Sequence, residues 1–200
     1  MAYKNHQPHF TCAIVVAHGD SEEIIAKHVR ACLKLPIHIH KRKTSIQING
    51  LVHELETNFK NVLSLNRNKD IHINVSKGKI LNDFKIFTLM DTDDCTEKIK
   101  ECYIDGSLFN GYALKDYVVP IYAISDMEEV LYKCKIIPKK FKDKEKVTGY
   151  KKVFDIPKPP YIESKVDELK KMSKTLEESK QTNLECFFNY CIEQSEKHKV

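Results

Sequence analysis

The stretch AIVVAHGDSEE, residues 13–23, changes from apolar to acidic within two residues. Its first half belongs to a run that is apolar on both faces of an extended chain, which predicts a central strand of a parallel sheet over residues 9–18. Its second half begins a helical period over residues 21–34, with Ser21 as the expected N-cap and acids in the first turn. The stretch therefore predicts a buried strand that turns directly into an amphipathic helix.

The same alternation of strand and helix continues through the first two thirds of the chain. The pattern predicts a strand at 37–42, a helix at 51–65, a strand at 83–94, and a strand that runs into a helix at 117–131. Pro120 weakens this last strand or places it at an edge of the sheet. Strands separated by helices predict an α/β fold, a mainly parallel sheet flanked by helices on both faces.

The character of the chain changes after residue 132. Residues 133–152 contain nine lysines against one Asp and one Glu, in a chain whose net charge is only +5. A proline-rich connector follows, and residues 162–198 predict two helices that divide near 181–183. We therefore expect a domain over residues 1–132, a lysine-rich segment and connector over 133–160, and a C-terminal helical extension over 161–200.

Composition excludes several classes of protein. Of 200 residues, 42% are hydrophobic and 30% are charged, and no apolar run approaches the roughly 20 residues that a transmembrane helix needs. The 7 cysteines are odd in number and scattered, which is typical of small buried hydrophobic residues rather than of a disulfide scaffold or zinc ribbon. With no signal-like N-terminus, we expect a cytoplasmic protein that does not enter a membrane.

Acidic side chains follow three of the predicted strands. They are found in residues 18–22, in Asp91-Thr92-Asp93-Asp94, and in residues 125–129. Because the carboxyl ends of parallel strands meet at one edge, where α/β proteins bind ligands, we expect these acids to lie together.

Asp91 and Asp93 alternate at the end of a strand, so both carboxylates can face one hard cation. Mg²⁺ or Mn²⁺ accepts two protein carboxylates together with water and substrate phosphates. Alternatively, the same residues cap a helix that begins near Cys95, because Asp and Thr are common N-caps. They also partly match the phosphatase motif DxDx[TV], although Cys95 stands where Thr or Val is required.

Three segments, VVAHGDSEE, FTLMDTDD and more loosely IYAISDMEEVL, give the chain a resemblance to the Toprim domain, most closely to the OLD-type nucleases and the RloB-like proteins. The resemblance covers about residues 10–132. It implies a metal-dependent nuclease that cleaves phosphodiester bonds of DNA or RNA, a role in defence against foreign nucleic acid, and an ATPase partner.

The resemblance also implies roles for individual residues. Glu22 matches the second acid of the first Toprim motif, Asp91 and Asp93 match the metal-binding pair, and the late acid is Glu128 or Glu129. The chain departs from the family at His18, where the family has its first glutamate. His18 replaces that glutamate as a base or metal ligand, marks a domain that has lost cleavage, or is a packed turn residue.

Two functions therefore remain open. In the first, Asp91 and Asp93 hold the cation, Glu22 acts as a third ligand or base with His18 beside it, and lysines of the basic segment bind the substrate backbone: Lys139, Lys140, Lys142 and Lys144. In the second, the chain is an inactive Toprim-like module that binds nucleic acid or protein. Metal dependence separates them, because electrostatic binding alone responds to salt but not to a chelator.

Overall fold

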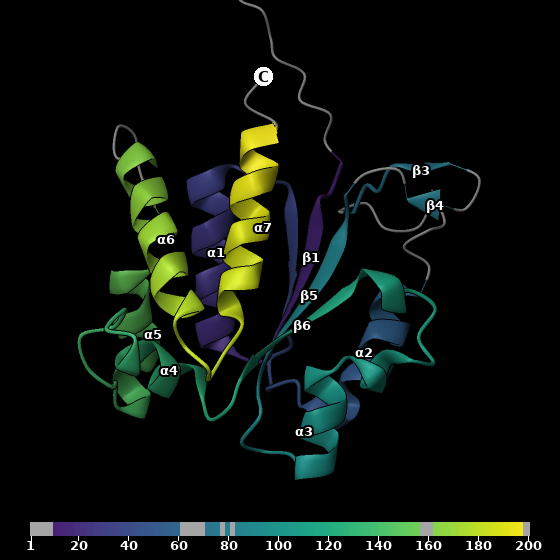
Figure 1. Cartoon of the computed structure of the whole chain (residues 1–200), viewed down its shortest axis with the longest axis horizontal. Helices are drawn as coiled ribbons and strands as arrows, with labels where there is room; N and C mark the ends of the chain where they lie inside the picture. Colours follow the sequence, from purple (N-terminus) through teal and green to yellow (C-terminus); the bar gives the residue numbers. More distant parts are fainter. Residues whose placement is uncertain (1–9, 61–70, 77–78, 81–82, 157–161, 198–200) are drawn as a thin grey trace, which may run out of the picture.

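A four-stranded, all-parallel sheet forms the centre of the protein (Figure 1). The computed structural model describes residues 10–60, 71–76, 79–80, 83–156 and 162–197. The strand order is β2-β1-β5-β6, with bounds β1 Ala13–Ala17, β2 Ile37–His40, β5 Lys85–Asp91 and β6 Val118–Ala123. The predicted α/β class, with a mainly parallel sheet flanked by helices, is confirmed.

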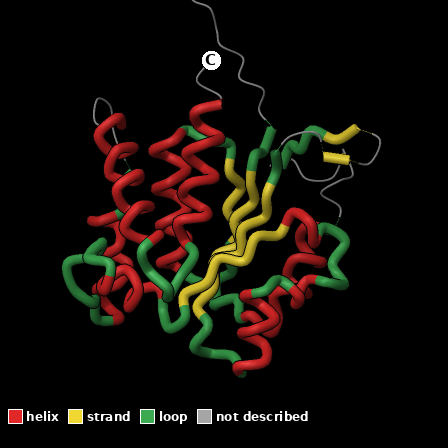
Figure 2. The backbone as a smooth tube through the Cα atoms, in the orientation of Figure 1, coloured by secondary structure: helices red, strands yellow, loops and turns green. Residues whose placement is uncertain are grey.

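Helices cover both faces of the sheet, as the red and yellow layers of Figure 2 show. One face carries α1 Asp20–Leu33, α4 Met127–Lys133, α5 Asp143–Val153, α6 Ile162–Glu177 and α7 Leu184–Lys197. The other carries α2 Ile48–Phe59, α3 Glu97–Ile104 and the short 3₁₀ turns η1 Ser107–Phe109 and η2 Lys115–Tyr117. A small hairpin, β3 Val75–Ser76 and β4 Lys79–Ile80, stands apart from the sheet.

The central strand β1 is apolar throughout because its side chains alternate between two faces that are both covered by helices. All five residues of β1 are buried. Ala13 and Val15 belong to the core on the α1 side, whereas Ile14 and Val16 belong to the core on the α2 side. Successive side chains of a strand point to opposite faces, so a strand covered on both sides requires apolar residues at every position.

The start of α1 differs from the sequence prediction. The N-cap is Gly19, not Ser21, and the Glu22 carboxylate accepts a hydrogen bond from the Gly19 backbone N–H at 2.9 Å. Ser21 is buried inside the first turn. The predicted serine hydroxyl would have accepted a hydrogen bond from an N–H two or three residues later, whereas here the N3 residue Glu22 reaches back to the N–H of the N-cap itself.

Two other predictions meet the structure in part. The helix predicted over 51–65 is α2, and residues 61–65 of that range lie outside the described residues, as do 157–160 of the connector and 161 and 198–200 of the C-terminal extension. The lysine-rich segment contains a helix, α5, that its charge pattern did not predict.

The edge position of Pro120 is confirmed, because β6 is the last strand in the order. The turn between α6 and α7 covers this edge. Asn183 accepts a hydrogen bond from the Tyr122 N–H at 2.9 Å and donates one to the Pro120 carbonyl at 2.9 Å, while the Thr182 hydroxyl donates to the Tyr122 carbonyl at 2.6 Å. The side chain of Asn183 thus pairs with β6 as a strand backbone would.

The two C-terminal helices pack onto the same core as the sheet. Leu184, Phe187, Phe188 and Cys191 of α7 are fully buried and share a cluster with β1, β5 and α1. Tyr190 of α7 also donates a hydrogen bond to the Cys12 carbonyl at 2.7 Å, just before β1. Across the described segments, none of the helices combines the length and apolar character that crossing a bilayer requires.

Candidate active site at the strand ends

The predicted acids lie where the connections of the sheet diverge. From β1 the chain proceeds through α1 to β2 on one side, and it later returns to β5 on the other side of β1. The space between the carboxyl ends of β1 and β5 is therefore a topological switch point, the place where open α/β sheets bind ligands. His18 and Glu22 follow β1 there, and Asp91 ends β5.

Glu22 is a buried carboxylate in the first turn of α1, only 2% exposed. One of its oxygens accepts the hydrogen bond from Gly19 described above. Burial raises the pKa of Glu22, while nearby backbone N–H groups and the positive charge of Lys146 act in the opposite direction. The helix cap thus holds this carboxylate at the switch point, in a place where its charge is poorly solvated.

Asp91 is a second buried carboxylate, 9% exposed, and its Oδ1 accepts a hydrogen bond from the Met127 N–H at 2.8 Å. Burial and then the negative charge of Glu22 raise the pKa of Asp91 to about 7, whereas the imidazole of His18 lowers it. The effect of the Glu22 charge on Asp91 indicates that the structure brings these two predicted residues together, with His18 beside them.

Thr92, a residue that the sequence did not single out, fixes the geometry of the DTDD segment. Its hydroxyl donates to the carbonyls of Ala123 at 2.8 Å and Ile124 at 3.0 Å, which ties the end of β5 to the end of β6. Asp93 is exposed beyond this clamp and still acts electrostatically on Asp91. The alternative that DTDD caps a helix is wrong, because the N-cap of α3 is Thr96.

His18 is held by its backbone, and its ring has an unsatisfied atom. The His18 N–H donates to the Leu89 carbonyl at 2.9 Å and its carbonyl accepts from Ile46 at 3.0 Å. Its ring Nδ1 is buried and has no hydrogen-bond partner. Such an atom is available to a ligand. Gly19 beside it has φ −150°, an extended conformation open to any residue, so the turn does not require glycine.

The structure separates Glu128 from Glu129, which the sequence could not do. Glu128 is 9% exposed, accepts a hydrogen bond from the Phe141 N–H, and lies 3.7 Å from the Lys146 Nζ. Glu129 instead pairs with Lys133 at 3.3 Å and with Lys140. Glu128 is therefore the acid that faces the interior, toward α5, and Glu129 faces the solvated lysines.

The four lysines predicted to bind nucleic acid differ in whether they are paired with an acidic side chain of the protein. Lys139 pairs with Glu145 at 3.5 Å, and Lys140 pairs with Glu129. Lys142 is the N-cap residue of α5, and Lys144 is exposed on the first turn of that helix. Two of the four therefore already neutralise carboxylates of the protein.

Two residues of α5 that the sequence analysis missed face the acids. Tyr150 is fully buried, and burial followed by the charges of Glu22 and Glu128 raises its pKa. Ser21 is near enough to influence Tyr150, yet the Tyr150 hydroxyl has no partner in hydrogen-bonding geometry. Lys146, one helical turn earlier, approaches Glu128 and Glu22.

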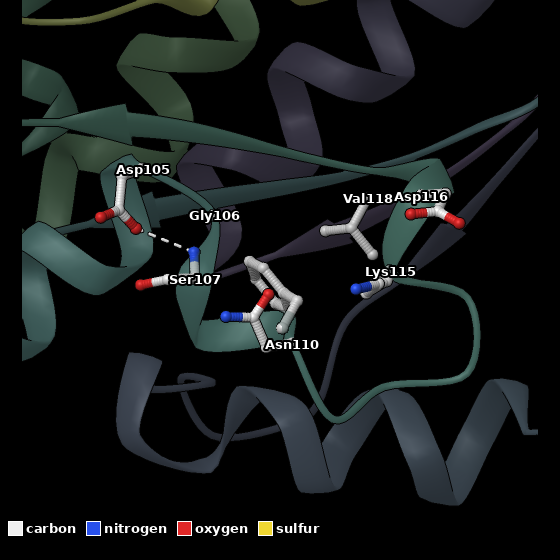
Figure 3. A pocket seen from close by; sticks show the side chains of 8 residues that line it. Asp105, Gly106, Ser107, Asn110, Lys115, Asp116 and Val118 are labelled. Atoms are coloured by element: carbon white, nitrogen blue, oxygen red, sulfur yellow. Dashed lines mark hydrogen bonds between the residues drawn. The ribbon is translucent and has the colours of Figure 1, made fainter.

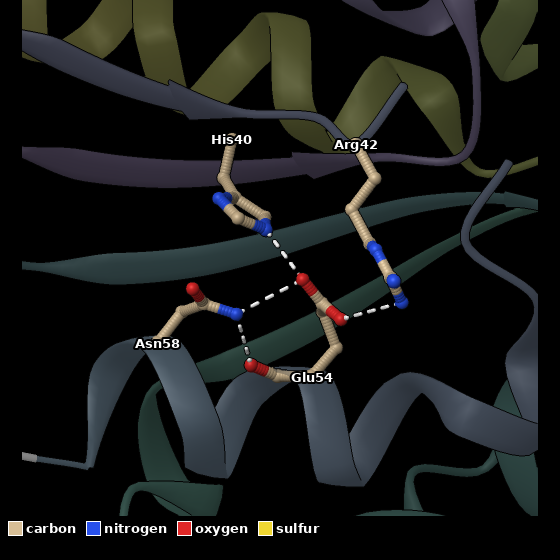
Figure 4. Close-up of polar contacts among 4 residues, drawn as sticks. All are labelled: His40, Arg42, Glu54 and Asn58. Atoms are coloured by element: carbon tan, nitrogen blue, oxygen red, sulfur yellow. Dashed lines mark hydrogen bonds and ion pairs between the residues drawn. The ribbon is translucent and has the colours of Figure 1, made fainter. Parts of the chain in front are cut away.

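Two other polar features lie elsewhere. Glu54 of α2 accepts hydrogen bonds from Asn58 at 2.9 Å and Arg42 at 3.3 Å and pairs with His40 at 2.7 Å (Figure 4), so His40 anchors β2 to α2.

A cavity of about 360 Å³ opens beside η1 and the first residue of β6, lined by Asp105, Ser107, Asn110 and Lys115 among others (Figure 3). It adjoins the opposite end of β6 from the acids.

Within the described ranges, no group of three or more His, Cys, Asp or Glu side chains could hold a metal ion by itself. In comparisons with known proteins, the chain matches no protein-family model, no curated protein and no solved structure.

Proposed function

We propose that the protein is a divalent-cation-dependent phosphodiesterase of Toprim type that cleaves nucleic acid. The observation that carries the proposal is the pair of buried carboxylates, Glu22 and Asp91, at the switch point between β1 and β5. Like charges in a poorly solvated site repel each other, and a shared proton or a cation relieves that repulsion.

The donor set suits a hard cation that keeps part of its water. Glu22 and Asp91 would supply carboxylate oxygens, exposed Asp93 would supply another, and the unsatisfied Nδ1 of His18 adds a nitrogen that Mn²⁺ accepts. Of these side chains, Glu22 and Asp91 are the carboxylate pair that the structure brings together, and Mg²⁺ is usually held by one or two carboxylates and completed by water and substrate phosphate. When bound, such an ion polarises a phosphoryl oxygen and lowers the pKa of a coordinated water.

The basic side chains near the site support nucleic acid as the substrate. Exposed Lys142 and Lys144 begin α5, the helix whose inner face meets Glu22 and Glu128. Phosphate contacts by lysine supply sequence-independent affinity that weakens with salt. We therefore expect substrate binding to fall steeply between 50 and 200 mM salt, as is general for such contacts.

The test combines metal binding with cleavage. The thermal midpoint of wild type and Asp91→Asn would be measured with Mg²⁺, Mn²⁺ or EDTA, beside cleavage of labelled single- and double-stranded DNA and RNA. Glu54→Gln is the matched control, because Glu54 is also a buried carboxylate but lies in the His40–Arg42 network. We expect Mn²⁺ to stabilise wild type and Glu54→Gln but not Asp91→Asn, with cleavage following the same order.

Stabilisation by Mn²⁺ without cleavage would instead favour the alternative, an inactive module that binds nucleic acid. In that alternative, cleavage is lost because His18 stands in place of the first Toprim glutamate. His18→Glu would restore the family glutamate and should then produce cleavage. If neither the metal nor Asp91→Asn changes the thermal midpoint, and no nucleic acid is cleaved, the proposed function is wrong.

A further inference from the structure

Helix α5 lies outside the Toprim resemblance, yet the fold holds it firmly against the acids. Tyr150 and Phe154 anchor it in the core, where their rings stack with centroids 5.9 Å apart. The ring of Phe141 packs directly on the helix at Gly149, where a Cβ would come within 2.5 Å of that ring. The lysine-rich segment is thus folded back onto α4 and α1.

This placement brings one cation to the buried carboxylates. The Lys146 Nζ lies 3.7 Å from the Glu128 Oε2, and its charge lowers the pKa of Glu22. The Lys146 side chain is 34% exposed, so it reaches inward from the protein surface. Lys139 and Lys140, in contrast, pair with Glu145 and Glu129.

The hydroxyl of Tyr150 marks the same place. Lys146 and Tyr150 are four residues apart, on one face of α5. The buried hydroxyl has no partner in hydrogen-bonding geometry, although the Ser21 side chain and three carboxylates, Glu22, Glu128 and Asp91, act on it. A buried polar group without a partner indicates a position that a ligand or water completes.

We propose that Lys146 is the internal counter-cation of two buried carboxylates, Glu128 and Glu22, and that a divalent cation bound by Glu22 and Asp91 must compete with it. Without the metal, the ammonium group offsets part of the carboxylate repulsion and holds α5 against the site. When the metal binds, its positive charge and that of the Lys146 ammonium group lie beside the same carboxylates and repel each other. The presence of Lys146 therefore weakens metal binding. The competition rests on the proposed function, whereas the counter-cation role does not.

The counter-cation role is tested without metal by a double-mutant cycle in EDTA. Lys146→Met and Glu22→Gln would be measured singly and together by urea unfolding. We expect Lys146→Met to destabilise wild type but to have a clearly smaller effect in the Glu22→Gln background. Lys146→Arg keeps the charge and should resemble wild type. Equal effects of Lys146→Met in both backgrounds would overturn the proposal.

The competition is tested by Mn²⁺ titration, read from the thermal midpoint. We expect Lys146→Met to bind Mn²⁺ about tenfold more tightly than wild type, because one unit of positive charge is removed from the neighbourhood of the ion. Lys151→Met is the control, since Lys151 is exposed on the same helix, and it should bind Mn²⁺ as wild type does.

The outcomes separate the two proposals. If wild type binds Mn²⁺ and Lys146→Met binds it equally or more weakly, the competition is wrong and the proposed function stands. Suppose that the double-mutant cycle shows coupling between Lys146 and Glu22, but that no variant binds Mn²⁺. Lys146 is then the counter-cation of carboxylates that do not bind metal, and the proposed function is wrong.

Discussion

Asp91 makes the stability of the metal-free protein depend on pH. Burial and the charge of Glu22 raise its pKa from the ordinary 3.8 to about 7, so the folded chain holds a proton that the unfolded chain releases. The stabilising effect of that proton is complete below pH 4 and is lost as the pH rises through 7. A carboxyl group with this behaviour favours the folded state in acid and disfavours it at neutral pH.

Asp91→Asn should therefore flatten the stability profile. In EDTA, wild type should lose more stability than Asp91→Asn between pH 5 and pH 8, because asparagine does not titrate. The amide oxygen can still accept the hydrogen bond from Met127, so the fold should persist. Urea unfolding at the two pH values measures the difference. Parallel profiles for the two proteins would show that Asp91 is ionised at both.

At the scale of a single helix, Gly149 determines how the lysine-rich segment packs. A methyl group at this position would clash with the Phe141 ring, which is 2.5 Å from the place of its Cβ. Gly149→Ala should therefore destabilise the protein by about 1–3 kcal/mol, the usual cost of overpacking, although alanine is the better helix former.

Gly50 in α2 offers the opposite case, because nothing lies within 4 Å of a Cβ there. Gly50→Ala should stabilise the protein through helix propensity, by no more than the roughly 0.5–1 kcal/mol of a helix interior because Gly50 lies in the first turn of α2. Urea unfolding of both variants compares the two effects. Equal changes at the two sites would mean that Phe141 does not rest on α5.

At the edge strand β6, Asn183 determines how the turn between α6 and α7 attaches to the sheet. Its side chain makes two hydrogen bonds to the β6 backbone, with Tyr122 and Pro120. Asn183→Ala should cost about 1–3 kcal/mol, since each net hydrogen bond contributes about 0.5–1.5 kcal/mol. Exchange of the Tyr122 amide hydrogen should also accelerate. Unchanged protection at Tyr122 would indicate that water replaces the side chain without loss.

Sequence patterns predicted those features that depend on local periodicity. The apolar run around β1, the acids after β1 and β5, and the edge position of Pro120 each leave a signal within a few residues. Lys146 and Tyr150 leave none, because a lysine among nine lysines and a buried tyrosine acquire their roles only when α5 folds back. The cap at Gly19 was missed because a side chain three residues later makes it.

For the whole molecule, the C-terminal helices are part of the main core. Leu169, Leu176, Leu184, Phe187 and Phe188 are all 0% exposed and share one cluster with β1 and α1. A chain ending at residue 160 would expose that face of the core. It should therefore lack a cooperative thermal transition, which circular dichroism would reveal. A sharp transition in the truncated chain would show that residues 1–160 fold independently.

The hydrogen bonds of Thr182 and Asn183 also limit how copies of this protein can associate. They occupy the backbone groups along the outer border of β6, where another strand would have to pair. The other edge strand of this sheet is β2, and the small hairpin of β3 and β4 is separate from the sheet. The chain's own α6–α7 turn therefore blocks strand pairing between two copies at the β6 edge of the sheet.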